Sequence, residues 1–239
     1  MLPPLFHKRL FLYLFIGFIL AVVVGTLSHE SGHWLAGRYL GFKEQHIAYN
    51  YTNYGIPDAH WLKRDSVIDE YHKEMISSPG LPVKDEYHKL IDEREHDYFL
   101  LTAGGPLQTM LTGTLGLILL LIYRRKFAIA DALSPPQWLM VFLALFWLRE
   151  IFDVVVAGIR LCAGRAWMEG DEFKMANYFH WPTWSIFIGT GFLSLLVLRT
   201  VVFRFVPAKQ RFTFIIAGFT GGLTGAWLWL ILLGPKLLP

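Results

Sequence analysis

Long hydrophobic segments alternate with short polar ones along the chain. The hydrophobic windows fall near residues 10–40, 98–123, 137–160, 183–203 and 212–233. Each window is close to the ~20 residues that a helix needs to span a bilayer. The pattern therefore predicts an all-α polytopic membrane protein with about five transmembrane helices and one long loop outside the membrane.

That loop, residues 42–97, is the least hydrophobic part of the chain. Residues 44–54 alternate polar and aromatic side chains, which favours an extended segment, whereas residues 85–97 are charged and typical of a helix. We therefore expect the loop to contain short helices and an extended segment. The whole chain, residues 1–239, is then a single membrane-embedded domain with the loop inserted between helices 1 and 2.

Composition supports the membrane class. The 239 residues are 54% hydrophobic and 16% aromatic, with a mean hydropathy of +0.40, which differs from the balance of water-soluble domains. The net charge of +3 arises from basic clusters beside the hydrophobic windows, so we expect no nucleic-acid partner. The single cysteine, Cys162, excludes an intrachain disulfide and a cysteine-based zinc site.

Basic residues flank alternate ends of the windows. They occur at 8–9 before the first helix, at 124–126 after the second, and at 204–211 between the fourth and the fifth. Positively charged residues favour the cytoplasmic side of a membrane. We therefore expect a cytoplasmic N-terminus, with residues 42–97 and 161–182 on the outer side.

The first window continues into a motif of ionisable residues, His29-Glu30-Ser31-Gly32-His33. Residues four apart share one face of a helix, so both imidazoles can bind one zinc ion while Glu30 reaches its water. Ionisable side chains at membrane depth cost about 2.5–3.5 kcal/mol each, which argues for a function. We predict a metal site with His29 and His33 as ligands and Glu30 as the catalytic base.

Two histidines leave zinc short of a third protein ligand, with water in the fourth position. Asp171 is one candidate, because its loop returns to the outer level of the membrane, close in depth to the histidines; its alternative role is the N-cap of a helix. Asp153, inside the third helix, is the rival, although Arg149 four residues earlier can neutralise it. Glu150 or Asp153 can instead orient a ligand through a hydrogen bond. Spacing alone does not decide between Asp153 and Asp171.

Small residues mark places where the spanning helices can approach one another or break. Gly25 and Gly32 should let neighbouring helices lie close to the first one. Ala103-Gly104-Gly105-Pro106 lies at the predicted depth of the histidines. A Gly-Gly-Pro sequence interrupts the hydrogen-bond ladder of a helix, so we expect a broken helix beside the site or, alternatively, a helix that begins there.

Three motifs together resemble a known family. They are His29-Glu30-x-x-His33 in the first helix, Gly105-Pro106 in a later one, and a downstream Asp. The chain resembles the site-2 protease family of intramembrane zinc metalloproteases, particularly small bacterial members without extra soluble domains. The resemblance covers roughly residues 10–40, 98–125 and 150–182.

The resemblance implies a protease that binds Zn²⁺ and cuts a transmembrane or membrane-proximal segment of a protein substrate in the bilayer. It implies His29 and His33 as ligands, Glu30 as the base, and a downstream Asp as the third ligand, for which Asp171 in Gly170-Asp171-Glu172 is the match. It also implies a bacterial inner or plasma membrane and an extended strand, here within residues 46–54, that can pair with an unwound substrate. The active site is expected towards the outer side on separate grounds, because the predicted topology puts His29 in the outer portion of the first helix.

The chain also departs from the family pattern. Gln108 and Thr109 stand where the family often has Asn after Gly-Pro, and Glu169-Gly170-Asp171-Glu172 stands where Leu-Asp-Gly is usual. These departures motivate an alternative function, a non-catalytic zinc-binding membrane chaperone or regulator with the same fold. A metal transporter ranks last, because the first, second, fourth and fifth helices carry few intramembrane charges.

Overall fold

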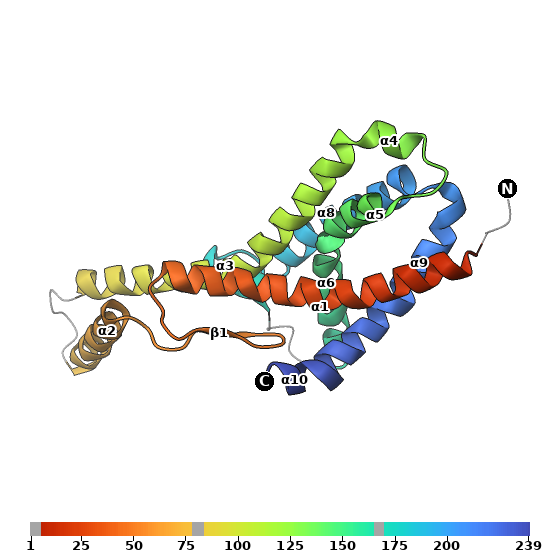
Figure 1. Ribbon diagram of the computed structural model, residues 1–239. Helices are drawn as coiled ribbons and strands as arrows, with labels where there is room; N and C mark the ends of the chain where they lie inside the picture. Colours follow the sequence, from red (N-terminus) through yellow and green to blue (C-terminus); the bar gives the residue numbers. More distant parts are fainter. Residues whose placement is uncertain (1–5, 78–83, 165–169) are drawn as a thin grey trace.

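The computed structural model describes residues 6–77, 84–164 and 170–239, and it is predominantly helical (Figure 1). Glu169 of the loop motif lies outside the described residues. The elements are α1 (Lys8–Tyr39), β1 (His46–Ile47), β2 (Thr52–Asn53), α2 (Ala59–Ser77), α3 (Lys84–Ile122), α4 (Arg124–Ala128), α5 (Pro135–Ala144), the 3-10 turn η1 (Leu145–Trp147), α6 (Leu148–Cys162), α7 (Asp171–Tyr178), α8 (Ser185–Thr200), the π-helical η2 (Val201–Phe205), α9 (Ala208–Trp227), the π-helical η3 (Leu228–Leu233) and α10 (Gly234–Leu237).

Within the described residues, four helical segments are long and apolar enough to cross a membrane. They are Lys8–Tyr39, Asp85–Ile122, Ser185–Phe205 and Ala208–Leu237. Four of the five hydrophobic windows therefore lie in helices of spanning length. The chain has the architecture of an all-α membrane protein, as predicted, but the count of five spans is not confirmed.

The remaining window, 137–160, is divided between α5 and α6 by the 3-10 turn η1. At this turn the Ser194 hydroxyl of α8 donates a hydrogen bond to the carbonyl of Trp147, and Trp147 packs closely against Gly113 of α3. A side chain that bonds to a helix carbonyl is a recognised cause of helix bending. α6 also carries four charged residues, which lowers its hydropathy as a span.

α3 is longer than predicted, because the charged residues 85–97 and the second window form one helix of 39 residues. The prediction of a helix broken or begun at Gly104-Gly105-Pro106 is wrong, since Pro106 lies inside α3. Figure 1 shows α3 beginning beyond the C-terminal end of α1, passing beside α1 near its own middle and then turning away from it. Proline lacks the N–H of the helical ladder, so a bend in place of a break is its expected effect when neighbouring helices supply packing.

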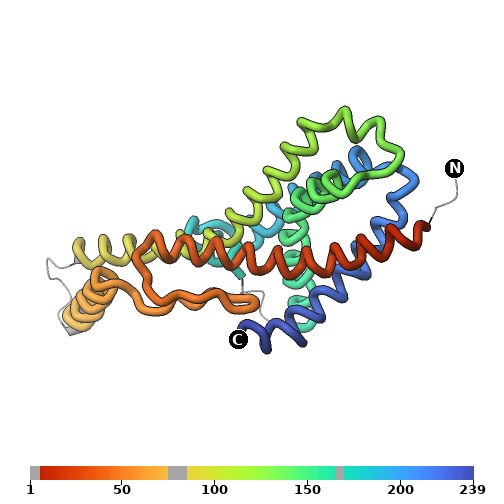
Figure 2. The backbone as a smooth tube through the Cα atoms, viewed as in Figure 1, coloured from red at the N-terminus to blue at the C-terminus, as the bar shows by residue number. Residues whose placement is uncertain are grey.

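The predicted extended segment is a short antiparallel hairpin. Its strands β1 and β2 pair His46 with Asn53 and Ile47 with Thr52, and an isolated bridge joins Lys43 to Ile56. The hairpin runs alongside the C-terminal half of α1, which both strands contact (Figure 2). Its tip is tied to the end of the chain: the N–H of Tyr49 donates to the Leu238 carbonyl at 3.0 Å, and Trp229 Nε1 donates to the Tyr49 carbonyl at 2.9 Å.

Glycines permit the closest contacts between helices. A Cβ added to Gly32 would collide with the carbonyl oxygen of Gly104, and one added to Gly104 would collide with the carbonyl oxygen of Gly32. The backbones of α1 and α3 therefore touch where the histidine motif lies. The prediction for Gly32 is confirmed, whereas Gly25 of the same helix faces open space and makes no such contact.

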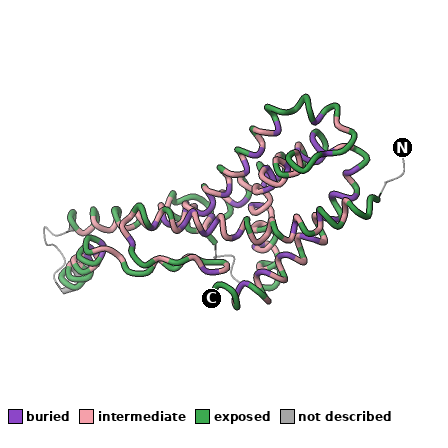
Figure 3. Tube along the Cα trace, in the orientation of Figure 1, coloured by how far each residue is buried: buried purple, intermediate pink, exposed green. Residues whose placement is uncertain are grey.

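Burial follows the crossing points of the helices (Figure 3). A large apolar cluster, including Phe18, Leu120, Val141 and Phe205, fills the end of the molecule where α1 begins. Many large apolar side chains on the outer faces are exposed, as expected of helices that contact lipid. The histidine motif lies towards the other end of α1, among the few buried polar residues.

We predict opposite effects of one methyl group at the two glycines of α1. Gly32→Ala should lower the free energy of unfolding by about 1–3 kcal/mol, because it separates α1 from α3. Gly25→Ala should raise it by up to about 1 kcal/mol, because alanine favours a helix and meets no neighbour. Thermal unfolding midpoints of the two purified variants in detergent measure the difference. Equal shifts at the two positions would contradict the glycine contact.

Candidate metal centre

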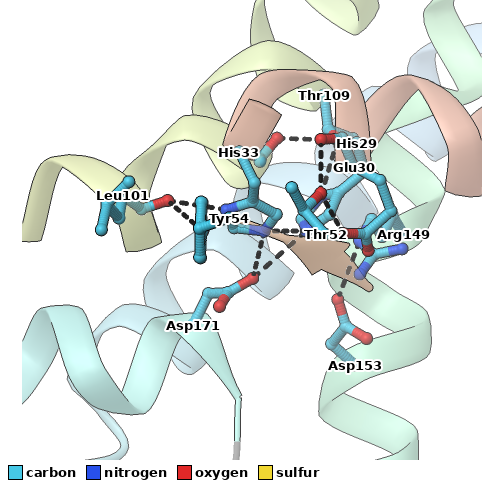
Figure 4. Close-up of polar contacts among 11 residues, drawn as sticks. His29, Glu30, His33, Thr52, Tyr54, Leu101, Thr109, Arg149, Asp153 and Asp171 are labelled. Carbon is cyan, nitrogen blue, oxygen red and sulfur yellow. Dashed lines mark hydrogen bonds and ion pairs between the residues drawn. The ribbon is translucent and has the colours of Figure 1, made fainter. Parts of the chain in front are cut away.

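α1 brings His29 and His33 onto one face, one turn apart, and α7 brings Asp171 against them (Figure 4). The two Nε2 atoms lie 3.1 Å apart. Asp171 Oδ2 lies 3.2 Å from His29 Nε2 and 3.1 Å from His33 Nε2. The three residues predicted as ligands are therefore in contact. Among the described residues, no second group of three histidine, cysteine or acidic side chains lies so close together.

The other nitrogen of each ring decides which way its lone pair points. His33 Nδ1 lies 2.7 Å from the carbonyl oxygen of Leu101, which can only accept a hydrogen bond, so Nδ1 carries the proton. His29 Nδ1 lies 3.0 Å from the Thr109 hydroxyl, whose own proton is donated to the carbonyl of Gly105. The neutral tautomers assigned by these partners leave both Nε2 atoms with a lone pair directed at Asp171.

Three lone-pair donors thus converge with no proton between them. Both histidines are almost completely buried, at 1% and 6% exposed, so water does not separate the three atoms. Such a group repels itself unless a cation or an added proton joins it. The separations fit a small metal ion, since ligand atoms at tetrahedral corners 2.0–2.1 Å from zinc are about 3.3 Å apart. Two imidazoles and one carboxylate are also a common ligand set of catalytic zinc.

Local backbone geometry delivers Asp171 to the histidines. Asp171 is the first residue of α7, and Gly170 before it has φ of 128°, a conformation that favours glycine. Gly170 occupies the N-cap position, so the alternative role of Asp171 as an N-cap is wrong. A carboxylate in the first turn is further stabilised by the helix dipole.

Adjacent carboxyl groups in α7 have opposite electrostatic environments. Burial raises the pKa of Asp171, but its contacts with His29 and His33 lower that pKa by more, to well below its usual range, because an imidazole that gains a proton on Nε2 donates a hydrogen bond to the carboxylate. Burial and the nearby carboxylate of Asp153 raise the pKa of Glu172 to about 8. Near neutral pH, therefore, Asp171 is ionised and Glu172 retains its proton.

Asp153, the rival candidate, lies apart from the histidine pair. Its Oδ2 is 3.6 Å from Arg149 Nε, four residues earlier on α6, which is the neutralising pair that the spacing allowed. Glu150 is buried, and within the described part of the chain its carboxylate oxygens have no hydrogen-bond partner. The predicted role of Glu150 or Asp153 in orienting a ligand is filled instead by Thr109 and the Leu101 carbonyl.

Glu30, the predicted base, is 4% exposed and faces the hairpin. The Thr52 hydroxyl of β2 lies 3.1 Å from Glu30 Oε2 and 2.9 Å from the Glu30 carbonyl oxygen (Figure 4). Thr52 therefore joins the hairpin to the motif and holds the carboxylate in place. The alternating pattern of residues 44–54 predicted the strand, but it offered no signal that singled out Thr52.

Tyr54 is a second residue of the hairpin that lies at the site. Its hydroxyl is 3.5 Å from the Leu101 carbonyl, the same oxygen that accepts the His33 hydrogen bond. Burial, followed by the negative charges of Asp171 and Glu30, raises the pKa of Tyr54 above its usual range. The hydroxyl therefore remains protonated and can act as a hydrogen-bond donor beside the site.

The Gly105-Pro106 sequence and the residues that follow it on α3 contact α1 at the histidine motif. A Cβ added to Gly105 would collide with both Nε2 atoms, so only glycine lets α3 approach the pair. Thr109, noted from the sequence as a departure from the family pattern, orients His29. Gln108, the other departure, donates from Nε2 to the Ser28 hydroxyl on α1 at 2.5 Å. The sequence did carry a signal for Thr109. It is a polar residue one helical turn after Gly105, and Gly105 lies at the membrane depth predicted for the ligands.

In comparisons with known proteins, the chain matches no family model, no curated protein and no solved structure.

Proposed function

We propose that the protein is a zinc-dependent intramembrane endopeptidase that cleaves a transmembrane or membrane-proximal segment of a partner protein. The observation that carries the proposal is the buried convergence of three metal-ligating atoms on His29, His33 and Asp171. Glu30, next to His29 on a helix of spanning length, supports hydrolysis as the reaction. The resemblance of the motif to the site-2 protease family points in the same direction.

Each residue has a defined role in this reaction. Zinc bound by the three ligands would lower the pKa of a water towards ~7 and polarise the substrate carbonyl. Glu30 would accept a proton from the water that attacks the peptide carbon, and it would return a proton to the amine as the C–N bond breaks. Thr52 holds the Glu30 carboxylate during this exchange, while Leu101 and Thr109 hold the imidazoles.

The position of the hairpin is an argument for a peptide as the substrate. A helical substrate hides its carbonyls in its own hydrogen bonds, so it has to be unwound before attack. A segment added in extended form to the edge of a strand would be held by main-chain hydrogen bonds. The hairpin lies within residues 46–54, and Thr52 of its strand β2 contacts Glu30. A substrate segment paired with the hairpin would therefore pass close to the base.

The depth of the site favours cleavage near one surface of the membrane. His29 lies about 30 Å along α1 from Lys8, at 1.5 Å per residue, which is close to the thickness of the hydrocarbon core. With Lys8 and Arg9 on the cytoplasmic side, the site faces the outer side. In this proposal α5, η1 and α6 together form a bent fifth membrane crossing. The whole chain is then a single membrane domain in a bacterial inner or plasma membrane.

Glu30→Gln separates catalysis from metal binding. The variant should retain zinc but lose at least ~10²-fold in cleavage rate, since amide nitrogen cannot act as the base. The probe is a panel of single-pass membrane peptides that carry a Gly-Pro pair in the apolar segment, and mass spectrometry detects products that have gained one water. Cleavage by Glu30→Gln at the parent rate would refute the assignment of the base. Zinc-loaded parent that cuts no peptide of the panel would favour the non-catalytic chaperone or regulator.

Thr52 tests whether the hairpin positions the base. Thr52→Val should lower kcat about tenfold, because a hydrogen bond to a charged group contributes about 1.5–3 kcal/mol. Thr52→Ser, which keeps the hydroxyl, should retain most of the activity. Zinc content and KM should stay near the parent values in both variants. If serine fails to rescue, or if valine has no effect on kcat, the hydrogen bond to Glu30 does not contribute to catalysis.

A further inference from the structure

A cavity of about 310 Å³ lies at the end of the molecule where α1 begins. The N–H of His7 donates to the Thr213 hydroxyl at 3.0 Å, so the start of α1 lies beside the first turns of α9 at this end. His29 is about 30 Å further along α1, and the cavity is therefore separate from the metal centre. The residues that line the cavity come from α4 and the loop after it, and from the turn between η2 and α9.

Three cations and one carboxylate line this cavity: Arg204, Lys209, Arg211 and Asp131. Two of the cations are engaged within the protein. Lys209 Nζ lies 3.2 Å from Asp131 Oδ1, and Arg211 donates to the carbonyls of Phe203 and Val206 at 2.6 Å and 3.0 Å. Arg211 thus caps the π-helical end of α8. The guanidinium of Arg204 has no hydrogen bond or ion pair to any residue that the structure describes.

The surroundings of the cavity are apolar. Phe127, Phe205 and Val206 line it and are buried, and the rings of Phe127 and Phe205 meet edge to face at 5.4 Å. Outside it, Phe203 is 62% exposed and Phe212 is 41% exposed. Three spanning helices end or begin around the cavity, at Ile122, Phe205 and Ala208. Net positive charge therefore lies at the level where lipid headgroups meet the ends of helices.

We propose that this cavity binds the phosphate-bearing headgroup of an anionic membrane lipid, with Arg204 as the principal contact. An unpaired guanidinium matches a phosphate in charge and geometry. Basic pockets between the ends of membrane helices are suited to such headgroups. The exposed Phe203 and Phe212 provide an apolar surface for the acyl chains, which a soluble phosphate would not use. The proposal is independent of proteolysis.

A matched pair of variants distinguishes this cavity from a diffuse basic surface. Arg204 lines the cavity, whereas Arg125 on α4 is an exposed cation of the same region that does not line it. Native mass spectrometry of the purified protein in detergent, titrated with phosphatidylglycerol or phosphatidylcholine, measures the affinity of the first bound lipid. Arg204→Gln should weaken phosphatidylglycerol binding about fivefold or more, the effect of one interfacial cation, and Arg125→Gln should change it less than about twofold.

Three results would overturn the proposal. Equal weakening by Arg204→Gln and Arg125→Gln would indicate diffuse surface attraction, and parent protein that binds phosphatidylcholine as tightly as phosphatidylglycerol would exclude charge recognition. Displacement of phosphatidylglycerol by millimolar inorganic phosphate would assign the cavity to a soluble anion. Unchanged elution volume and zinc content of Arg204→Gln establish that the variant is folded.

Discussion

The rest of the structure depends on one constraint: two imidazole nitrogens and a carboxylate oxygen lie close together, and each directs a lone pair at the same small volume. Buried together without a cation or a proton, His29, His33 and Asp171 repel one another. Their rings cannot turn away, because Leu101 and Thr109 hold the opposite nitrogens. The fold therefore maintains an arrangement that is unfavourable alone and becomes favourable when a cation or a proton joins the three atoms, and this is the arrangement on which the proposed zinc site rests.

Backbone features, more than side chains, allow this arrangement inside a helical membrane protein. Gly32 and Gly104 let α1 and α3 touch, and Gly105 leaves room for the imidazoles. Pro106 removes one N–H from the hydrogen-bond ladder of α3, near the Leu101 carbonyl that accepts the hydrogen bond from His33. On the other side of the motif, the hairpin adds Thr52 to Glu30 and is itself held by the C-terminal residues. Together these contacts fix α1, α3 and the hairpin around the site.

The part of the site that lies on one helix could be predicted from the sequence, because the helical period alone puts His29 and His33 on one face. Asp171 could be named only alongside Asp153, since membrane depth restricts position along one axis and leaves the loop free in the other two. Thr52 and the Leu101 carbonyl could not be predicted, because both depend on packing between distant segments. The bend at Trp147 escaped prediction for the same reason: its partner, Ser194, is on another helix.

The zinc content of purified protein, compared between Asp171→Ala and Asp153→Ala, tests the central claim most directly. The account predicts about one zinc ion per parent chain, loss of zinc in Asp171→Ala, and retention in Asp153→Ala, since two histidines alone hold zinc weakly. Matching elution profiles of the two variants exclude unfolding as the cause. Zinc lost with Asp153→Ala but kept with Asp171→Ala, or a parent chain that binds none after reconstitution, would contradict the account.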